Sequence, residues 1–298
     1  MRVFVTGASG FIGSAVVSEL IGSGHGVVGL ARSDASAAAL AATGAEVQRG
    51  DLDDPDSLQA GMAGADGVIH LAYNHDFSQP VAAAQTDRRA IETLGAALEG
   101  SDRPLVIASG LSGFALGRVI TERDAPDPVA YPRVASAQAA LSLAPRGVRS
   151  SVIRLAPTVH GEGDRAFIPT LIGVARRKGV SGYIGDGENR WPAVHRLDAA
   201  RLFRLAVEGA PAGSVLHGVA DEGVPVREIA SVIGRHLGLP VVSIPAEQAA
   251  EHFGWLARFL AADTPASSTL TRELLGWQPT HPGLLDDLEQ GHSFLHPS

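Results

Sequence analysis

Three glycines near the start of the chain have the spacing of a phosphate-binding turn. Gly7, Gly10 and Gly13 follow a β-branched run and open an apolar helical stretch. The first glycine permits a tight turn, the second lets the backbone approach a pyrophosphate, and the third lets the helix pack close to the strand. The alternative is an ordinary glycine-rich turn. The residues expected to hold the phosphates are Gly7, Ser9, Gly10, Phe11, Ile12 and Gly13.

A second group of polar side chains follows a later apolar run. Tyr73, Asn74 and His75 come directly after residues 68–71, which have the composition of a buried strand. Ligands bind open α/β sheets at the carboxyl ends of the strands. These side chains could therefore polarise a carbonyl or an imine, or deliver a proton through water. The alternative is a capped loop that enters the next helix.

The elements that must position these residues alternate along the first half of the chain. Strands are predicted at 2–5, 27–30, 46–48, 68–71, 105–108 and 152–155. Helices are predicted at 11–21, 35–42, 55–62, 81–98 and 134–143. This alternation indicates βαβ units and a buried parallel sheet with right-handed crossovers.

Composition excludes several classes of function. The 298 residues include 24 basic and 32 acidic side chains, and the longest cationic run is Arg176 to Lys178, so no nucleic-acid partner is expected. The chain has no cysteine, which excludes disulfides, Cys-zinc sites and thiol nucleophiles. The 11 histidines are scattered, and we expect no metal. No 18 apolar residues run uninterrupted, so no membrane partner is expected and a cytoplasmic location is the default.

Several motifs occur in the order found in one family. They are Thr6–Gly13, Gly50–Leu52, Val68–Ala72, Arg154–Gly161, Gly185–Gly187, Val194–Ala200 and Leu274–Pro279. Together they resemble the extended and atypical branches of the short-chain dehydrogenase/reductase family, the NAD(P)-dependent epimerase/dehydratase group. The resemblance implies a Rossmann-type fold and further cofactor contacts, with the adenine beside Asp51 and Leu52. The other implied contacts are Leu71, Ala72, Pro157, Thr158 and Val159.

The end of the second predicted strand indicates which dinucleotide is bound. NAD enzymes usually place an acid there to accept from the ribose hydroxyls, but that position falls near Ala31, and Arg32 and Ser33 follow it. A guanidinium can hold a 2′-phosphate by charge-assisted hydrogen bonds. We therefore predict NADP(H). In the alternative interpretation Arg32 is a solvated loop charge and Asp34 takes the ribose.

The catalytic pair of the resembled family, a Tyr followed four residues later by a Lys, is incomplete. The only lysine is Lys178, and position 174 is Val. Tyr131 has Ala135 four residues later, whereas counting back from the sixth strand puts Arg133 near the Lys position. The upstream hydroxyl is expected from Ser109 or Ser112, although a structural role is equally open for both. The candidate catalytic residues are thus Tyr73, Asn74, His75, Ser109, Ser112, Tyr131 and Arg133.

These observations lead to one prediction of fold and function. The fold class is α/β, a Rossmann-type doubly wound parallel sheet over residues 1–160, with 194–220 returning to it. Segments 161–193 and 221–298 form a smaller, mostly helical substrate-binding region. The resemblance places the residues after Gly185–Gly187 near the substrate cleft. It implies that Trp191 walls the substrate pocket and that His195 either contacts substrate or holds backbone as a core histidine.

The predicted activity is NADP(H)-dependent reduction of a small carbonyl or imine. The alternatives are a sugar-nucleotide epimerase or dehydratase and a non-catalytic NADP(H) sensor. The resemblance also implies a homodimer, for which the alanine-rich helices at 81–98 and 134–143 could serve.

Overall fold

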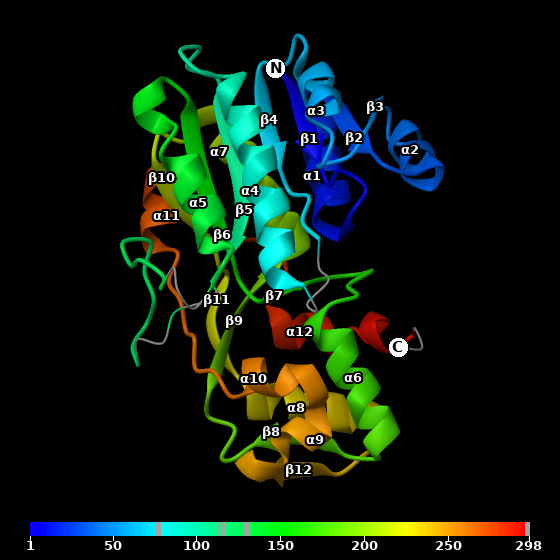
Figure 1. Cartoon of the computed structure of the whole chain (residues 1–298). Coiled ribbons are helices and arrows are strands. Elements are labelled where there is room, and N and C mark those ends of the chain that lie inside the picture. Colours follow the sequence, from blue (N-terminus) through cyan, green and yellow to red (C-terminus); the bar gives the residue numbers. More distant parts are fainter. Residues whose placement is uncertain (75–78, 112–113, 115–116, 128–130, 296–298) are drawn as a thin grey trace.

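The larger lobe of the chain is built around a seven-stranded parallel sheet (Figure 1). The computed structural model describes residues 1–74, 79–111, 114, 117–127 and 131–295. The strand order is β10-β6-β5-β4-β1-β2-β3. Their bounds are β1 Arg2–Thr6, β2 Gly26–Ala31, β3 Glu46–Arg49, β4 Gly67–His70, β5 Pro104–Gly110, β6 Arg149–Leu155 and β10 Ser214–Gly218. The order reverses between β1 and β4, which places the ligand-binding edge beside the ends of these two strands.

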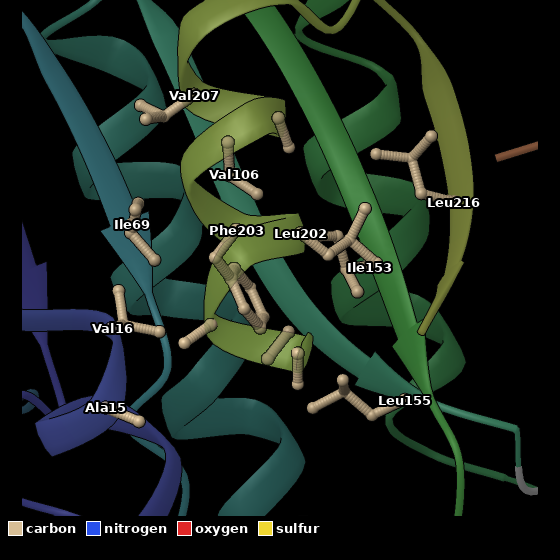
Figure 2. Packing of buried hydrophobic residues seen from close by; sticks show 14 of the residues in the cluster. Ala15, Val16, Ile69, Val106, Ile153, Leu155, Leu202, Phe203, Val207 and Leu216 are labelled. Atoms are coloured by element: carbon tan, nitrogen blue, oxygen red, sulfur yellow. The ribbon is translucent and has the colours of Figure 1, made fainter. Parts of the chain in front are cut away.

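Helices cover both faces of this sheet because successive side chains of each strand point to opposite faces. In β1, Val3 and Val5 join the core under α1 (Phe11–Gly22) and α7 (Arg196–Gly209), whereas Phe4 joins the core on the other face. Figure 2 shows the first core, with Leu202 and Phe203 of α7 over the strands. The second core is covered by α3 Pro55–Met62, α4 Pro80–Ala96 and α5 Val134–Leu141. Helix α2, Asp34–Ala41, flanks β2 and β3. The predicted Rossmann-type sheet is confirmed.

The smaller lobe combines helices with two small sheets (Figure 1). One sheet has the order β11-β9-β7 and the other pairs β12 with β8. The strands are β7 Thr158–His160, β8 Ser181–Ile184, β9 Arg190–His195, β11 Asp221–Pro225 and β12 Val241–Ile244. The helices are α6 Phe167–Lys178, α8 Val226–Leu237, α9 Ala249–Phe253, α10 Ala257–Leu260 and α12 Leu284–Glu289. The short β-strands in this half were not predicted.

Part of the C-terminal segment differs from the predicted boundary, because it packs on the large sheet. Ala266 bridges to Ile120, and Trp277, which is fully buried, joins the core beneath α7. Helix α11, Thr269–Leu275, lies beside β10. The Trp277 indole donates to the Asp198 carbonyl at 3.0 Å, which fixes the segment to α7. Within the described residues, no helix is long and apolar enough to cross a membrane.

Candidate functional site

The glycine loop is as tight as the sequence predicts. Gly7 has φ of 67°, and a Cβ added there would lie 2.6 Å from the Ala72 nitrogen. A Cβ on Gly13 would lie 2.0 Å from the Gly7 carbonyl oxygen, so only glycine lets α1 start this close to β1. No side chain caps α1 at Gly10. Free helix N–H groups in a cradle that a Cβ would fill fit the pyrophosphate of a dinucleotide.

The residues after β2 are those predicted to lie at the adenosine end of the cofactor. Arg32 has an 83% exposed side chain, and its Nε lies 3.8 Å from Asp51 Oδ2. Ser33 caps α2 by accepting from the Ser36 nitrogen at 3.2 Å. The Asp34 carboxylate is 2.9 Å from Arg49. Arg32 is therefore the guanidinium at this edge with the most freedom to meet an added anion.

A buried chain of hydrogen bonds leads away from the glycine loop. Thr6 Oγ1 accepts from the backbone nitrogens of Leu71 and Ala72, at 3.2 and 3.3 Å, and lies 2.8 Å from His70 Nδ1. His70 Nε2 lies 3.1 Å from Asp87 Oδ1. A carboxylate can only accept, so we assign the imidazole proton to Nε2, and the Thr6 hydroxyl then donates to Nδ1. This chain joins β1, β4 and α4.

Arg133 extends this series of hydrogen-bonded side chains to the edge of the sheet. Its Nη2 donates to the Ala108 carbonyl at 3.0 Å, and its Nε lies 3.8 Å from Asp87 Oδ2. Both the Nε and the Oδ2 are buried, and neither has a hydrogen-bond partner among the described residues. Burial opposes ionisation of Asp87, but the hydrogen bond from His70 and the charge of Arg133 outweigh it and lower the Asp87 pKa.

The guanidinium of Arg133 also lies over the Tyr73 ring, with Cζ 3.9 Å from the ring centre. This distance is within the range of a cation–π contact. Burial raises the pKa of the Tyr73 phenol, Arg133 opposes this rise, and Asp87 adds to it. The phenol is therefore protonated at neutral pH and can act as an acid. Tyr73 follows Ala72, the residue that contacts Gly7.

The other predicted catalytic residues are dispersed or lie outside the described residues. Asn74 is exposed directly after Tyr73, and Ser109 is partly buried near the end of β5. The Tyr131 ring lies 5.7 Å from the guanidinium of Arg258, a residue of α10 in the smaller lobe. His75 and Ser112 lie outside the described residues. The structure thus joins Tyr73 with Arg133 and directs Tyr131 toward the other lobe.

The segment expected at the nicotinamide leads into the smaller lobe. Pro157 and Val159 are partly buried, and Thr158 is 2% exposed with a buried hydroxyl that has no partner among the described residues. Residues 158–160 form β7, which pairs in parallel with β9. The backbone at this point is therefore fixed by a strand.

Trp191 and His195, the predicted substrate residues, are both buried in β9. Trp191 is 1% exposed, donates from Nε1 to the Phe259 carbonyl at 3.1 Å, and packs edge-on against Phe167. In this position its indole packs against the ring of the partly buried Phe167. His195 Nδ1 accepts from the Leu197 nitrogen at 3.2 Å and thereby caps α7. This geometry matches the core-histidine interpretation of His195.

His195 belongs to a histidine–carboxylate cluster between β7, β9 and α12. Asp287 Oδ2 lies 2.9 Å from His160 Nδ1 and 3.5 Å from His292 Nε2, and Asp287 Oδ1 lies 4.0 Å from His195 Nε2. Burial and the His160 charge lower the His195 pKa to about 4. Burial raises the pKa of the nearby Asp164 carboxyl to about 6. No group of three or more His, Asp or Glu in the described chain could hold a metal ion.

Three residues near the predicted site were missed by the sequence analysis. His70 ends a strand, Asp87 lies in α4, and Arg196 begins α7 beside the Phe11 ring. Asp87 carried a usable signal, because a carboxylate among apolar residues at helical spacing must be paired when buried. Arg196 carried none, because its contact joins residues far apart in sequence.

Comparison with known proteins agrees with this geometry. A profile of the NAD dependent epimerase/dehydratase family matches residues 3–216. An uncharacterized protein of Schizosaccharomyces pombe is 52% identical over 97% of this chain and 98% of its own length. The 4-hydroxy-2-methyl-3-oxo-4-farnesyl-3,4-dihydroquinoline-1-oxide ketoreductase of Stigmatella aurantiaca is 29% identical over 89% of this chain and 84% of its own. Among solved structures, MoeE5 in complex with UDP-glucuronic acid and NAD has a TM-score of 0.74 and 27% identity, covering 97% of this chain and 96% of that one.

Proposed function

The chain belongs to the NAD dependent epimerase/dehydratase family, and on that premise we propose that it is an NADP(H)-dependent oxidoreductase that reduces a small carbonyl or imine compound. The observation that carries this proposal is the Arg133 guanidinium over the Tyr73 ring, held from behind by Asp87. It brings a phenol and a fixed cation together at the edge where the glycine loop lies. The name of the Stigmatella aurantiaca relative, a ketoreductase, supports the choice of a carbonyl substrate.

The roles of the residues follow from their charges. When bound, the nicotinamide supplies the hydride. Tyr73 gives its phenol proton to the carbonyl oxygen or imine nitrogen as the hydride reaches the carbon. The raised pKa of Tyr73 keeps this proton in place at neutral pH, and Arg133 stabilises the phenolate that forms. Water then returns the proton. A positioned acid of this kind contributes about 10²–10⁴-fold to the rate.

The structure also suggests how the cofactor is held. The glycine loop and the first turn of α1 would bind the pyrophosphate, and Arg32 would hold the 2′-phosphate. The pairing of Asp34 with Arg49 supports this assignment, because Asp34 is then less available to a ribose. We expect Arg32→Ala to weaken NADPH binding about tenfold and to leave NADH binding unchanged, as measured by fluorescence titration. An unchanged preference for NADPH would contradict the assignment.

Deuteride transfer tests the reaction directly. The purified protein is incubated with 4-deuterated NADPH and a panel of ketones, aldehydes and imines, and the products are examined by mass spectrometry. Deuterium in a product establishes the oxidoreductase, and Tyr73→Phe should reduce the labelling rate while cofactor affinity stays unchanged. Tight NADPH binding without label in any product would overturn the proposal and favour a sensor or a sugar-nucleotide enzyme.

We propose in addition that the protein is a cytoplasmic homodimer. Helices α4 and α5 pack side by side on one face of the sheet, and their outer surfaces could pair with a second copy. Light scattering at micromolar protein should give twice the mass of one chain. A monomer under these conditions would contradict the dimer.

A further inference from the structure

Arg196 places a cation where three segments of the chain meet. It is the first residue of α7, and its Cζ lies 5.3 Å from the ring centre of Phe11, the first residue of α1. A Cβ on Gly161 would lie 3.2 Å from Arg196 Cγ, and one on Gly163 would lie 3.9 Å from Nη1. Arg196 thus lies between the start of α1 and the loop that follows β7.

The charge of Arg196 is not balanced by the residues around it. In the described parts of the chain, no carboxylate lies within 4 Å of its guanidinium and no acceptor takes a hydrogen bond from it. Arg204 of the same helix, by contrast, is paired with Glu19 and Glu208 at 2.7 and 2.8 Å. Arg196 is nevertheless only partly exposed.

The position is also unfavourable for a cation in the absence of an anion. Helix N-termini carry partial positive charge, so cations are favoured at the other end of a helix. Arg196 lies at the N-terminus of α7 and contacts the first residue of α1, whose N-cap Gly10 provides no side-chain oxygen. Two helix ends and a guanidinium therefore converge, and the acidic residue in the first turn of α7, Asp198, accepts from Thr280 and His281 and not from Arg196. A phosphate is the anion that this arrangement would favour.

We infer that Arg196 is a binding residue for the pyrophosphate of the dinucleotide and adds a guanidinium to the phosphate site of the glycine loop. The inference goes beyond the proposed reaction, because it concerns nucleoside diphosphate binding and needs only the cofactor class of the family. The contact with the Phe11 ring holds the Arg196 guanidinium beside the glycine loop. Gly161 leaves the space that the Arg196 side chain occupies, since a Cβ there would crowd it.

The test compares AMP with ADP, which share the adenosine and differ by one phosphate. Affinities are measured by isothermal titration calorimetry on wild type, Arg196→Met, Arg196→Lys and the control Arg201→Met. Arg201 lies on the same helix and is also partly buried, but it has no ring contact with Phe11. Met keeps most of the length of the side chain and removes the charge.

We expect the wild type to bind ADP more tightly than AMP, and Arg196→Met to reduce this ratio about tenfold, the size of one charge-assisted hydrogen bond. Arg196→Lys should restore part of the ratio, and Arg201→Met should leave it unchanged. A ratio in Arg196→Met equal to that of wild type, or a wild type that does not prefer ADP, would overturn the inference. Failure of deuteride transfer with an intact effect on the ADP ratio would instead contradict only the proposed reaction.

Discussion

Two buried aspartates in this molecule each contact a histidine, but the second oxygen of each faces a different partner. Asp87 has His70 at 3.1 Å on one oxygen and Arg133 at 3.8 Å on the other. Asp287 has His160 at 2.9 Å on one oxygen and His195 at 4.0 Å on the other. Arginine is always protonated, whereas His195, with a pKa lowered to about 4, gains a charge only in acid. The same pair of side chains therefore gives a fixed charge in one region and a pH-dependent charge in the other.

The location of the two pairs agrees with this difference. The Asp87 pair leads through Arg133 to the Tyr73 phenol at the edge of the sheet, where the proposed reaction would transfer a proton. The Asp287 pair joins α12 to β7 and β9, where strands and helices of the smaller lobe meet. We therefore expect substitutions in the first pair to affect turnover and those in the second to affect how stability changes with pH.

The largest effect is expected at the fixed charge. Arg133→Met should lower deuteride transfer about 100-fold, because the Tyr73 phenolate loses the cation that stabilises it. His292→Gln, which changes a neighbour of Asp287, should change transfer less than fivefold by the same order-of-magnitude reasoning. Single-turnover kinetics with saturating NADPH measure both rates. Equal losses in the two variants would remove the distinction between the regions.

A smaller but clear effect is expected on stability at neutral pH. Asp87→Asn leaves the Arg133 guanidinium, 27% exposed, without its buried counter-charge, and should cost about 3 kcal/mol of unfolding free energy. Asp287→Asn removes a charge whose second oxygen faces His195, which a pKa of about 4 leaves neutral at this pH, and should cost about 1 kcal/mol. Urea unfolding at pH 7 provides both values. A larger loss for Asp287→Asn would reverse the comparison.

The smallest effects are expected when acid is added to the histidine–carboxylate cluster. Asp164 has a pKa raised to about 6, so its carboxyl holds a proton more tightly in the folded than in the unfolded state. Its contribution to the free energy of unfolding therefore falls as pH rises from about 4 to about 6. His195 has a pKa lowered to about 4, so its contribution rises from about 4 to about 6.5. The two contributions oppose each other and flatten the pH dependence of the wild type.

Single substitutions should reveal how each group changes the free energy of unfolding with pH. Relative to wild type, Asp164→Asn should lose about 1 kcal/mol of stability on acidification from pH 6.5 to 4.5, and His195→Asn should gain about 1 kcal/mol. Asn can still cap α7 in place of the His195 side chain. Urea unfolding at several pH values shows the slopes. Parallel curves for both variants and wild type would mean that neither group titrates in this range.

The features that the sequence predicted are local, whereas the contacts that it missed join distant segments. The glycine loop, the strands β1 to β6 and the family were predicted because local rules govern them: glycine spacing, β-branched runs and helical periodicity. The confirmed fold class follows from those local elements. Counting residues predicted Arg133 as a site residue, which stays a prediction, and did not predict its contact with Asp87.

The missed contacts depend on chain segments that meet only in the folded molecule. His160 and Asp287 are 127 residues apart in sequence. Arg196 and Phe11, which are in contact, are likewise separated by most strands of the large sheet. No periodicity or spacing rule connects such pairs. Trp191 was predicted as a pocket wall from the family resemblance, and that role stays a prediction. The resemblance did not indicate the contacts with Phe167 and Phe259 that bury the indole.

The order of strands along the chain also sets the order of events during synthesis. The edge strand β10 emerges from the ribosome only after β7, α6, β8 and β9, although it pairs with β6. Ala266 and Trp277, which complete the packing on the large sheet, emerge later still. A nascent chain that ends after β6 therefore exposes an unpaired, apolar strand edge. Until β10 pairs with β6, that edge is open to pairing with a strand of another chain.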